Sequence, residues 1–477
     1  MMLLSQAAQV LGFELVGHDI LFTSVSSDSR AINAGDLFIA LQGDNYDGAS
    51  FVASATQSGA VAALVKTTSY RGADSPCPLL LVEDTRMALG HLAAHWREQL
   101  NVPLVAVTGS NGKTTVKEML ASILRAATGN DDAVLATLGN LNNDIGVPLT
   151  LLKLRAAHRY AVIEMGMNHK GEIEYLTRLA RPDAAIVNNA GSAHLAGLGS
   201  VDAVARAKGE IFTGLSPHGT AVINADDAYA PLWRDLADGH KIIEFGLGKS
   251  VAVHAQWQIK GYGAHIEVSL PQDSFSAQLQ VPGEHNVRNA LAATAAALAL
   301  HVPLPAIVAG LENFSGVAAR LQHKAALHGA MLIDDSYNAN PASLRAALKV
   351  LAQSTGKKIL VLGDMGELGE DAVRLHGEIG EEALRLGVNQ LFALGKLTPH
   401  TVRKFGTGAR HFERIEDLFA ALDKNLDVDS TVLVKGSRFM HMERVVQHCT
   451  GTNEAIEVSG REEPLHKTHN NFSTLPS

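Results

Sequence analysis

One glycine-rich segment constrains this chain more than any other feature. The apolar run 104–107 leads, after one threonine, into the string Gly109-Ser110-Asn111-Gly112-Lys113-Thr114-Thr115. Apolar residues then recur at helical spacing over 116–124. Glycines let backbone amides converge on phosphate oxygens, while Lys113 adds positive charge and Thr114 offers a hydroxyl to Mg²⁺. The order strand, loop, helix therefore predicts a phosphate-binding loop.

This loop departs from the general pattern in one place. The pattern asks for a glycine five residues before Gly112, where this chain has Val107, so we expect a variant class of the loop. The alternative is a glycine-rich turn with a surface lysine, which explains neither the Lys-Thr pair nor the start of the helix. Phosphate binding alone is compatible with a kinase, a GTPase switch, a motor or a ligase.

The chain is long enough for several domains. At about 100–200 residues a domain, 477 residues predict roughly three. Apolar runs alternate with helical segments across 103–250 and again across 331–434, and the period changes to two across 251–281. We predict an α/β fold with a small mixed domain at 1–102, a central parallel-sheet ATPase domain with antiparallel edge strands at 103–318, a Rossmann-like domain at 319–458 and a disordered polar tail at 459–477.

Composition limits which partners and which cell compartment we expect for this chain. The net charge of −9 gives no global cationic field for nucleic acid, so we expect none to bind. Cys77 and Cys449 belong to no Cys/His cluster, which fits a reducing compartment. The longest apolar stretch, 290–300, is too short to span a membrane, and 1–10 lacks the pattern of a secretory signal. We expect a cytoplasmic protein without membrane insertion. No pattern fixes the oligomeric state, and a monomer is our expectation.

Further polar residues lie where apolar strands end. Glu164 follows such a run and is a natural Mg²⁺ ligand, although a solvated charge would look the same. His194 follows another run, where a lone histidine is usually a loop residue. Lys208 falls on a predicted helix, where a solvated lysine is the ordinary interpretation. The row 334–341 after an apolar run is unusually polar for a turn and indicates a site.

Several strings together resemble the Mur ligase family, the ATP-dependent amide-bond ligases that build the peptide of bacterial peptidoglycan. The resemblance covers nearly the whole chain up to the tail. It rests on Ser27-Asp28-Ser29-Arg30, Gly35-Asp36-Leu37-Phe38, Gly139-Asn140-Leu141-Asn142-Asn143-Asp144-Ile145-Gly146-Val147-Pro148, Asp335-Ser336-Tyr337-Asn338-Ala339-Asn340-Pro341 and Gly363-Asp364-Met365-Gly366-Glu367-Leu368-Gly369. The third and fourth strings point most specifically to the family member that adds D-alanyl-D-alanine to UDP-N-acetylmuramoyl-tripeptide.

The resemblance implies roles around ATP and Mg²⁺. Lys113 and its loop would hold the β- and γ-phosphates. Thr114 and Glu164 would bind Mg²⁺, with His194 on or near a second metal. Lys208 matches a lysine that is carbamylated in several members, and carbamylation would turn an ammonium into an anion able to position a metal.

The resemblance also assigns residues to the nucleotide and to domain closure. Asn286 and Asn289 match the adenine-binding segment. Arg320 and Asp335 match third-domain residues that reach the phosphates and the ribose. Ala319 stands where the family usually has glycine, which leaves the shape of that turn open. The residues expected on the peptide or nucleotide side of the third domain are Tyr337, Asn338, Lys435 and Arg438.

The remaining candidates would contact the UDP-linked substrate. The first domain would bind the UDP end, with Ser29, Arg30, Asn45 and Asp47 as candidates, although Asn45 and Asp47 also suit an ordinary turn. Three amides near Gly139 suit a ligand rich in oxygen atoms, and we assign Asn140, Asn142 and Asn143 to the muramoyl-peptide.

The implied reaction is ADP-forming amide ligation through an acyl phosphate. Two alternatives stay open. One is a sibling, either another Mur enzyme or a folylpolyglutamate synthetase, with a different amine or acceptor. The other is a nucleotide-binding regulator without ligase activity.

Overall fold

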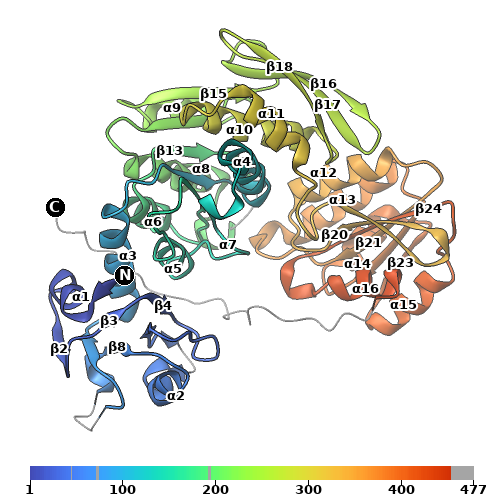
Figure 1. Ribbon diagram of the computed structural model, residues 1–477. Helices are drawn as coiled ribbons and strands as arrows, with labels where there is room; N and C mark the ends of the chain where they lie inside the picture. The colour runs from blue at the N-terminus through green and yellow to red at the C-terminus, as the bar shows by residue number, and fades with distance from the viewer. Residues whose placement is uncertain (44–45, 71–74, 192–194, 453–477) are drawn as a thin grey trace.

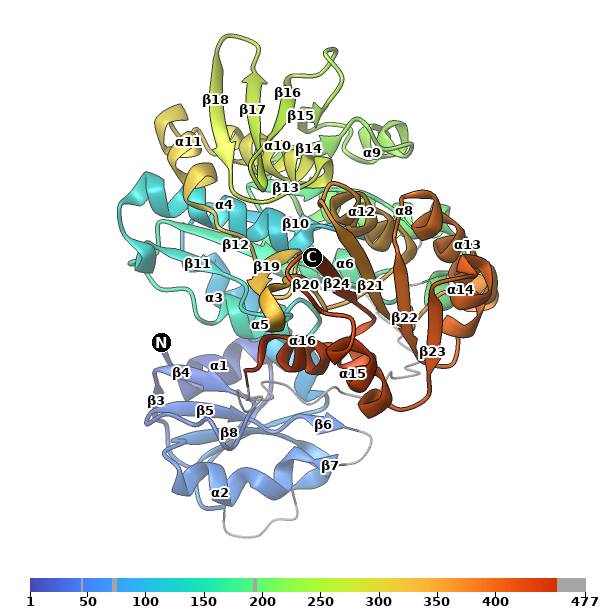
Figure 2. The ribbon, with the colours of Figure 1, turned by 90° about the vertical axis from the view of Figure 1, so that its right-hand side faces the viewer.

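The computed structural model describes residues 1–43, 46–70, 75–191 and 195–452. Three α/β units follow one another along the chain, from the blue N-terminal unit through the green and yellow central unit to the orange and red C-terminal unit (Figures 1 and 2). Each unit is built on its own sheet. This confirms the predicted α/β architecture in three parts. No helix in the described ranges is long and apolar enough to cross a membrane.

The N-terminal unit has a five-stranded sheet in the order β2-β9-β8-β5-β4, parallel except for β2. Its strands are β2 (Glu14–Val16), β4 (Ser24–Ser26), β5 (Asp36–Ile39), β8 (Ala62–Lys66) and β9 (Leu79–Val82). Two small pairs flank it, namely β1 (Met2–Leu3) with β3 (Leu21–Phe22) and β6 (Gln42–Gly43) with β7 (Tyr46–Asp47). The helices are α1 (Leu4–Leu11), α2 (Val52–Gln57) and α3 (Thr85–Glu98).

The central unit has a nine-stranded sheet in the order β11-β12-β10-β13-β14-β15-β16-β17-β18. The first seven strands run parallel, which confirms the parallel sheet predicted from the apolar runs; the seventh, β16, falls in the segment predicted as antiparallel but pairs parallel with β15. They are β10 (Leu104–Thr108), β11 (Val134–Ala136), β12 (Tyr160–Glu164), β13 (Ala184–Val187), β14 (Thr220–Asn224), β15 (Lys241–Gly246) and β16 (Val253–Lys260). Strands β17 (Gly263–Ser269) and β18 (Ser274–Leu279) continue antiparallel, which confirms the predicted antiparallel edge.

Both faces of this sheet are buried because side chains alternate along each strand. On β10, Leu104 and Ala106 pack with helices of one face, while Val105 and Val107 pack with helices of the other. The first set of helices is α5 (Gly146–Leu151), α6 (Glu172–Ala180), α8 (Val201–Gly209) and α9 (Ala230–Leu236). The second is α4 (Lys113–Thr128), α10 (Glu284–Ala299) and α11 (Leu304–Asn313). The short helix α7 (Leu195–Leu198) precedes α8.

The C-terminal unit has a six-stranded sheet in the order β19-β20-β24-β21-β22-β23, with only its edge strand β19 antiparallel. Its strands are β19 (Gln322–Ala325), β20 (Met331–Asp335), β21 (Lys357–Gly363), β22 (Gln390–Leu394), β23 (Ala409–Phe412) and β24 (Ser430–Lys435). Helices α12 (Pro341–Ala352), α13 (Ala372–Arg385) and α14 (Thr398–Phe405) contribute to the core on one face, and α15 (Ile415–Asp423) and α16 (Glu443–Thr450) to the core on the other.

The register of the central sheet brings the polar residues at the carboxyl ends of β12, β10 and β13 close together. Val107 of β10 lies opposite Glu164 of β12, and Thr108 lies opposite Val187 of β13. The glycine loop after β10 therefore begins between Glu164 on one side and Asn188 on the other. Ligands of open α/β sheets bind at this carboxyl edge, so the fold itself selects where the site lies.

Candidate active site

The glycine loop runs from the end of β10 into the sixteen-residue helix α4. Gly112 caps that helix with φ of 81°, and a Cβ atom there would lie 2.5 Å from the side-chain oxygen of Asn289. Both the left-handed backbone and the close neighbour therefore require glycine. Gly112 has no side chain to cap the helix, so the first backbone N–H groups of α4 are left available to bind an anion.

Lys113 is folded back over this loop. Its Nζ donates a 2.8 Å hydrogen bond to the carbonyl of Gly109. Burial lowers the pKa of Lys113, and the charge of nearby Glu164 acts in the opposite direction. The lysine side chain thus contacts the loop that would hold phosphates, and it is near enough to Glu164 for the two charges to interact.

Glu164 is only 2% exposed, so its interpretation as a solvated strand-end charge is wrong. Its Oε1 accepts a 2.8 Å hydrogen bond from the side chain of Asn142, and its backbone N–H donates to Thr137 Oγ1 at 2.9 Å. Oε2 is buried and has no hydrogen-bond partner within the described ranges. A buried carboxylate oxygen left without a donor is suited to a cation.

Lys208, on α8, is fully buried, and the interpretation as a solvated surface lysine is wrong as well. Its Nζ has no hydrogen-bond partner among the residues that the structure places. Burial holds the pKa of Lys208 well below its ordinary value, and the positive charge of Lys113 lowers it further. Both effects favour the neutral amine, the form of lysine that acts as a nucleophile.

The residues present fit a divalent cation near the loop. Glu164 Oε2 supplies an unpaired anionic oxygen, and the Thr114 hydroxyl stands at the start of α4, 9% exposed. His194, the candidate for a second metal, lies outside the described residues. The described residues contain no ready-made cluster of three or more His, Cys, Asp or Glu side chains. Such a cation would therefore depend on ligands beyond the carboxylates, such as hydroxyl, phosphate and water oxygens.

A chain of asparagines connects the loop to α10. Asn286 accepts a 3.0 Å hydrogen bond from Asn289, whose oxygen accepts another 3.0 Å bond from Asn188. Asn188 also donates to the backbone carbonyl of Asn111 at 3.0 Å. Asn286 and Asn289 are 6% and 4% exposed. The two candidate nucleotide residues on α10 are therefore built into the same network as the glycine loop.

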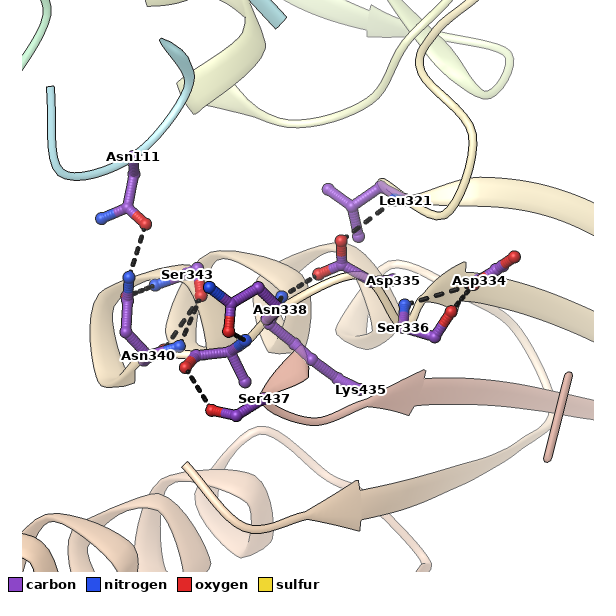
Figure 3. A network of polar contacts seen from close by, with 11 residues as sticks. Asn111, Leu321, Asp334, Asp335, Ser336, Asn338, Asn340, Ser343, Lys435 and Ser437 are labelled. Carbon is purple, nitrogen blue, oxygen red and sulfur yellow. Dashed lines mark hydrogen bonds and ion pairs between the residues drawn. The ribbon is translucent and has the colours of Figure 1, made fainter. Parts of the chain in front are cut away.

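The C-terminal unit reaches the loop through two side chains. Arg320 donates from Nη2 to the Thr114 hydroxyl at 3.1 Å, and its guanidinium lies 4.4 Å from the centre of the Tyr337 ring. Asn340 donates to the side-chain oxygen of Asn111 at 2.8 Å (Figure 3). These contacts bring together residues more than two hundred positions apart, and they place an arginine at the helix N-terminus.

Asp335 and Lys435 form a buried ion pair beside these contacts (Figure 3). Lys435 Nζ lies 2.5 Å from Asp335 Oδ2 and 2.9 Å from the carbonyl of Asn338. Burial raises the pKa of Asp335, while the charge of Lys435 opposes that rise. Ser437 bonds to the backbone of Ala339 and Gly366, so the strand-end loops of this unit are tied into one surface. Arg438 is paired with Glu443 at 2.9 Å and is partly exposed.

Of the candidates for the UDP-linked substrate, Asn142 joins this cluster through its hydrogen bond to Glu164. Arg30 is exposed and paired with Asp28 at 2.7 Å, and Ser29 lies between them. Asp47 caps the short 3₁₀ helix Gly48–Phe51 and accepts from Ser69 at 2.8 Å. Asn45 lies outside the described residues. In the loop before α5, Asn140 and Asn143 are exposed, and Asn143 accepts from the N–H of Gly146 at 2.8 Å.

Sequence reasoning missed two supports of the site. Asn189 accepts from the N–H of Asn111 at 2.8 Å, and its position two residues after the end of β13 was a signal for it. Lys117 is 1% exposed and donates to the carbonyl of Thr137 at 2.6 Å. Thr137 is the residue whose hydroxyl accepts the hydrogen bond from the Glu164 backbone N–H. Lys117 lies on the apolar face of α4 with Val116 and Leu120, and that placement alone could have drawn attention to it.

Fold and site together define a P-loop nucleotide-binding protein with a third unit that contacts the phosphate loop. Family models match the chain in three places: "Mur ligase family, catalytic domain" at residues 21–97, "Mur ligase middle domain" at 107–297 and "Mur ligase, glutamate ligase domain" at 319–438. The chain belongs to the Mur ligase family.

Relatives cover nearly the whole chain. The UDP-N-acetylmuramoyl-tripeptide--D-alanyl-D-alanine ligase of Escherichia coli is 42% identical over 93% of this chain and 97% of its own length. A crystal structure of MurF from Acinetobacter baumannii matches with a TM-score of 0.85 at 38% identity, over 93% of this chain and 97% of that one. MurF from Thermotoga maritima in complex with ADP matches with a TM-score of 0.79 at 26% identity, over 90% and 97%.

Proposed function

We propose that this chain joins D-alanyl-D-alanine to UDP-N-acetylmuramoyl-tripeptide with the cleavage of ATP to ADP and phosphate. The observation that carries the proposal is the meeting of three groups at one helix N-terminus: Lys113 on the glycine loop, the unpaired carboxylate of Glu164 and Arg320 from the C-terminal unit. The substrates are those in the names of the relatives, which match over almost their full length.

The chemistry needs positive charge at the place where two anions meet. The tripeptide carboxylate would attack the γ-phosphorus, ADP would leave, and an acyl phosphate would result. The amine of D-alanyl-D-alanine would then attack the acyl carbon, and phosphate would leave with one of the original carboxylate oxygens. Lys113 and Arg320 both lie at the loop and would neutralise the repulsion between carboxylate and triphosphate.

Mg²⁺ would be held by the Thr114 hydroxyl and Glu164 Oε2, with His194 as the candidate near a second ion. Bound there, the ion would supply charge neutralisation for the phosphates. The N-terminus of α4 positions Thr114 for this role. The hydrogen bond from Asn142 orients the carboxylate of Glu164.

Lys208 supports a modification at the same site. Its neutral amine would add to the carbon of CO₂ and lose one proton, which gives a carbamate anion where a buried cation would be unfavourable. The absence of a partner for Nζ in the described ranges leaves that atom unsatisfied, and the new anion could position a metal.

The other assignments divide the substrates between the units. We assign 1–102, 103–318 and 319–458 as the three domains. The adenosine would lie by Asn286, Asn289 and Asp335, next to the glycine loop. The UDP end would contact Ser29, Arg30, Asn45 and Asp47, and the muramoyl-peptide would contact Asn140, Asn142 and Asn143. The peptide side of the C-terminal unit would be Tyr337, Asn338, Lys435 and Arg438.

We place the reaction in the cytoplasm and take the chain to act as a monomer. Cys77 and Cys449 are both buried and free, which fits a reducing compartment.

The test is phosphate release by purified protein with ATP and Mg²⁺, in the presence of UDP-N-acetylmuramoyl-tripeptide, D-alanyl-D-alanine, both or neither. The proposal expects release that requires both, with a pentapeptide product identified by mass. Release with a different acceptor or amine would favour a sibling ligase. Nucleotide binding without any amide product would favour a regulator.

A further inference from the structure

Tyr262 links the central sheet to the linker that carries Arg320. It lies in the turn between β16 and β17, and its hydroxyl donates a 2.5 Å hydrogen bond to the carbonyl of Leu321. Its ring is tilted against His323 with centroids 3.3 Å apart, and it packs on the apolar core of the C-terminal unit. One side chain of the central unit thus contacts the neighbour of Arg320 directly.

The Leu321 residue is held from its other side as well. Its N–H donates to Asp335 Oδ1 at 3.2 Å, and Asp335 is in turn paired with Lys435 (Figure 3). The N–H is therefore fixed by the C-terminal sheet, and the carbonyl is fixed by the central sheet.

The backbone on both sides of Arg320 requires such restraint. Ala319 and Leu321 have φ of 58° and 51°, in the left-handed region that L residues other than glycine disfavour. Two such residues around one arginine persist only when contacts from outside hold them. The Ala319 carbonyl accepts from the N–H of Tyr337 at 3.3 Å, and Leu321 has the two bonds described above.

We propose that Tyr262 is a positioning residue for Arg320. Its hydroxyl fixes the strained linker so that the guanidinium stays between Thr114 and the Tyr337 ring. The inference rests on the proposed function for its kinetic consequence, but the placement of Arg320 can be measured without turnover.

The experiment compares Tyr262→Phe with Tyr160→Phe and the unchanged protein. Tyr262→Phe keeps the ring and removes only the hydroxyl. Tyr160 is the first residue of β12, and Glu164 is the last. Tyr160→Phe therefore serves as the control, because it also removes a tyrosine hydroxyl but does so away from the linker. Two readouts are taken: kcat and KM in the ligase assay, and the rate at which phenylglyoxal modifies Arg320, followed by peptide mass mapping.

With Tyr262→Phe we expect kcat to fall about three- to tenfold, as for loss of one hydrogen bond, with the KM for D-alanyl-D-alanine changed less than about twofold. Arg320 should be modified at least about three times faster. Tyr160→Phe should change neither. Unchanged kcat, unchanged labelling of Arg320, or equal effects in the two variants would each overturn the inference. Lack of ligase activity in the unchanged protein would instead count against the proposed function, and labelling would still decide the role of Tyr262.

Discussion

The side chain of Asn340 donates a 2.8 Å hydrogen bond to the side-chain oxygen of Asn111, which joins the C-terminal unit to the phosphate loop. Asn340 also caps α12 by accepting from the N–H of Ser343 at 2.9 Å. One asparagine therefore begins a helix in one unit and contacts the glycine loop of another.

Replacing Asn340 by serine separates these two roles. Serine remains a good helix cap, so folding should change little, but it is too short to reach Asn111. We expect kcat/KM for ATP to fall about two- to tenfold, the effect of one net hydrogen bond. Steady-state kinetics together with a thermal melt measure this. A melt lowered strongly with kinetics intact would contradict a role for Asn340 in joining the units.

Lys208 predicts a pH dependence of stability. Its pKa is lowered on folding, so between the folded value and the ordinary value of about 10.4 the unfolded chain binds more protons. The free energy of unfolding should therefore rise with pH across this window, by up to about 1.4 kcal/mol per pH unit. Lys208→Met removes this contribution.

Denaturant unfolding of both proteins in CO₂-free buffers from pH 6 to 9 measures the effect. The difference between Lys208→Met and the unchanged chain should be largest at low pH and shrink as pH rises. Parallel curves would mean that Lys208 keeps its proton in the folded state.

Glu164→Gln should weaken the use of Mg²⁺. The amide keeps the size of the side chain and can still contact Asn142, but it removes the anionic oxygen that has no partner in the described structure. We expect the Mg²⁺ concentration for half-maximal activity to rise about tenfold or more. Glu174→Gln is the control, since Glu174 is an exposed partner of Arg178. An unchanged Mg²⁺ requirement would remove Glu164 from the metal site.

Lys117→Met should lower the free energy of unfolding, because Lys117 is a buried support of the residues next to Glu164. The substitution leaves the carbonyl of Thr137 without its buried donor and Glu118 without its partner at 2.5 Å. We expect a loss of about 1–3 kcal/mol in the free energy of unfolding. Lys117→Arg keeps the charge and should lose less. Equal stability of Lys117→Met and the unchanged protein in denaturant unfolding would show that the pair contributes nothing.

Local patterns predicted much of the fold. The run 104–107, the glycine loop and the helical spacing after it gave β10 and α4 because periodicity and glycine placement are local properties. The period of two over 251–281 likewise marked the antiparallel edge. Short pairs such as β1 with β3 were not predicted, since two-residue strands carry no period.

Contacts between distant segments could not be read from the sequence. Lys208 lies at helical spacing from Val204 and Ala205, so the pattern places it on the apolar face of its helix, but how completely it is buried depends on packing from other elements. The left-handed backbone at Ala319 is similar: the alanine takes up a conformation that glycine adopts freely, and its carbonyl is held by the N–H of the distant Tyr337. His194, Asn45 and the tail at 459–477 lie outside the described residues, so those predictions stand as they were.

The most direct test of the account follows one oxygen atom. UDP-N-acetylmuramoyl-tripeptide is labelled with ¹⁸O in its reacting carboxylate and incubated with the protein, ATP, Mg²⁺ and D-alanyl-D-alanine, and the released phosphate is analysed by mass. An acyl-phosphate ligase must transfer one ¹⁸O to each phosphate while the pentapeptide forms, and this is the result we predict. Phosphate that carries no ¹⁸O would show that ATP is cleaved by water, and it would contradict the proposed reaction.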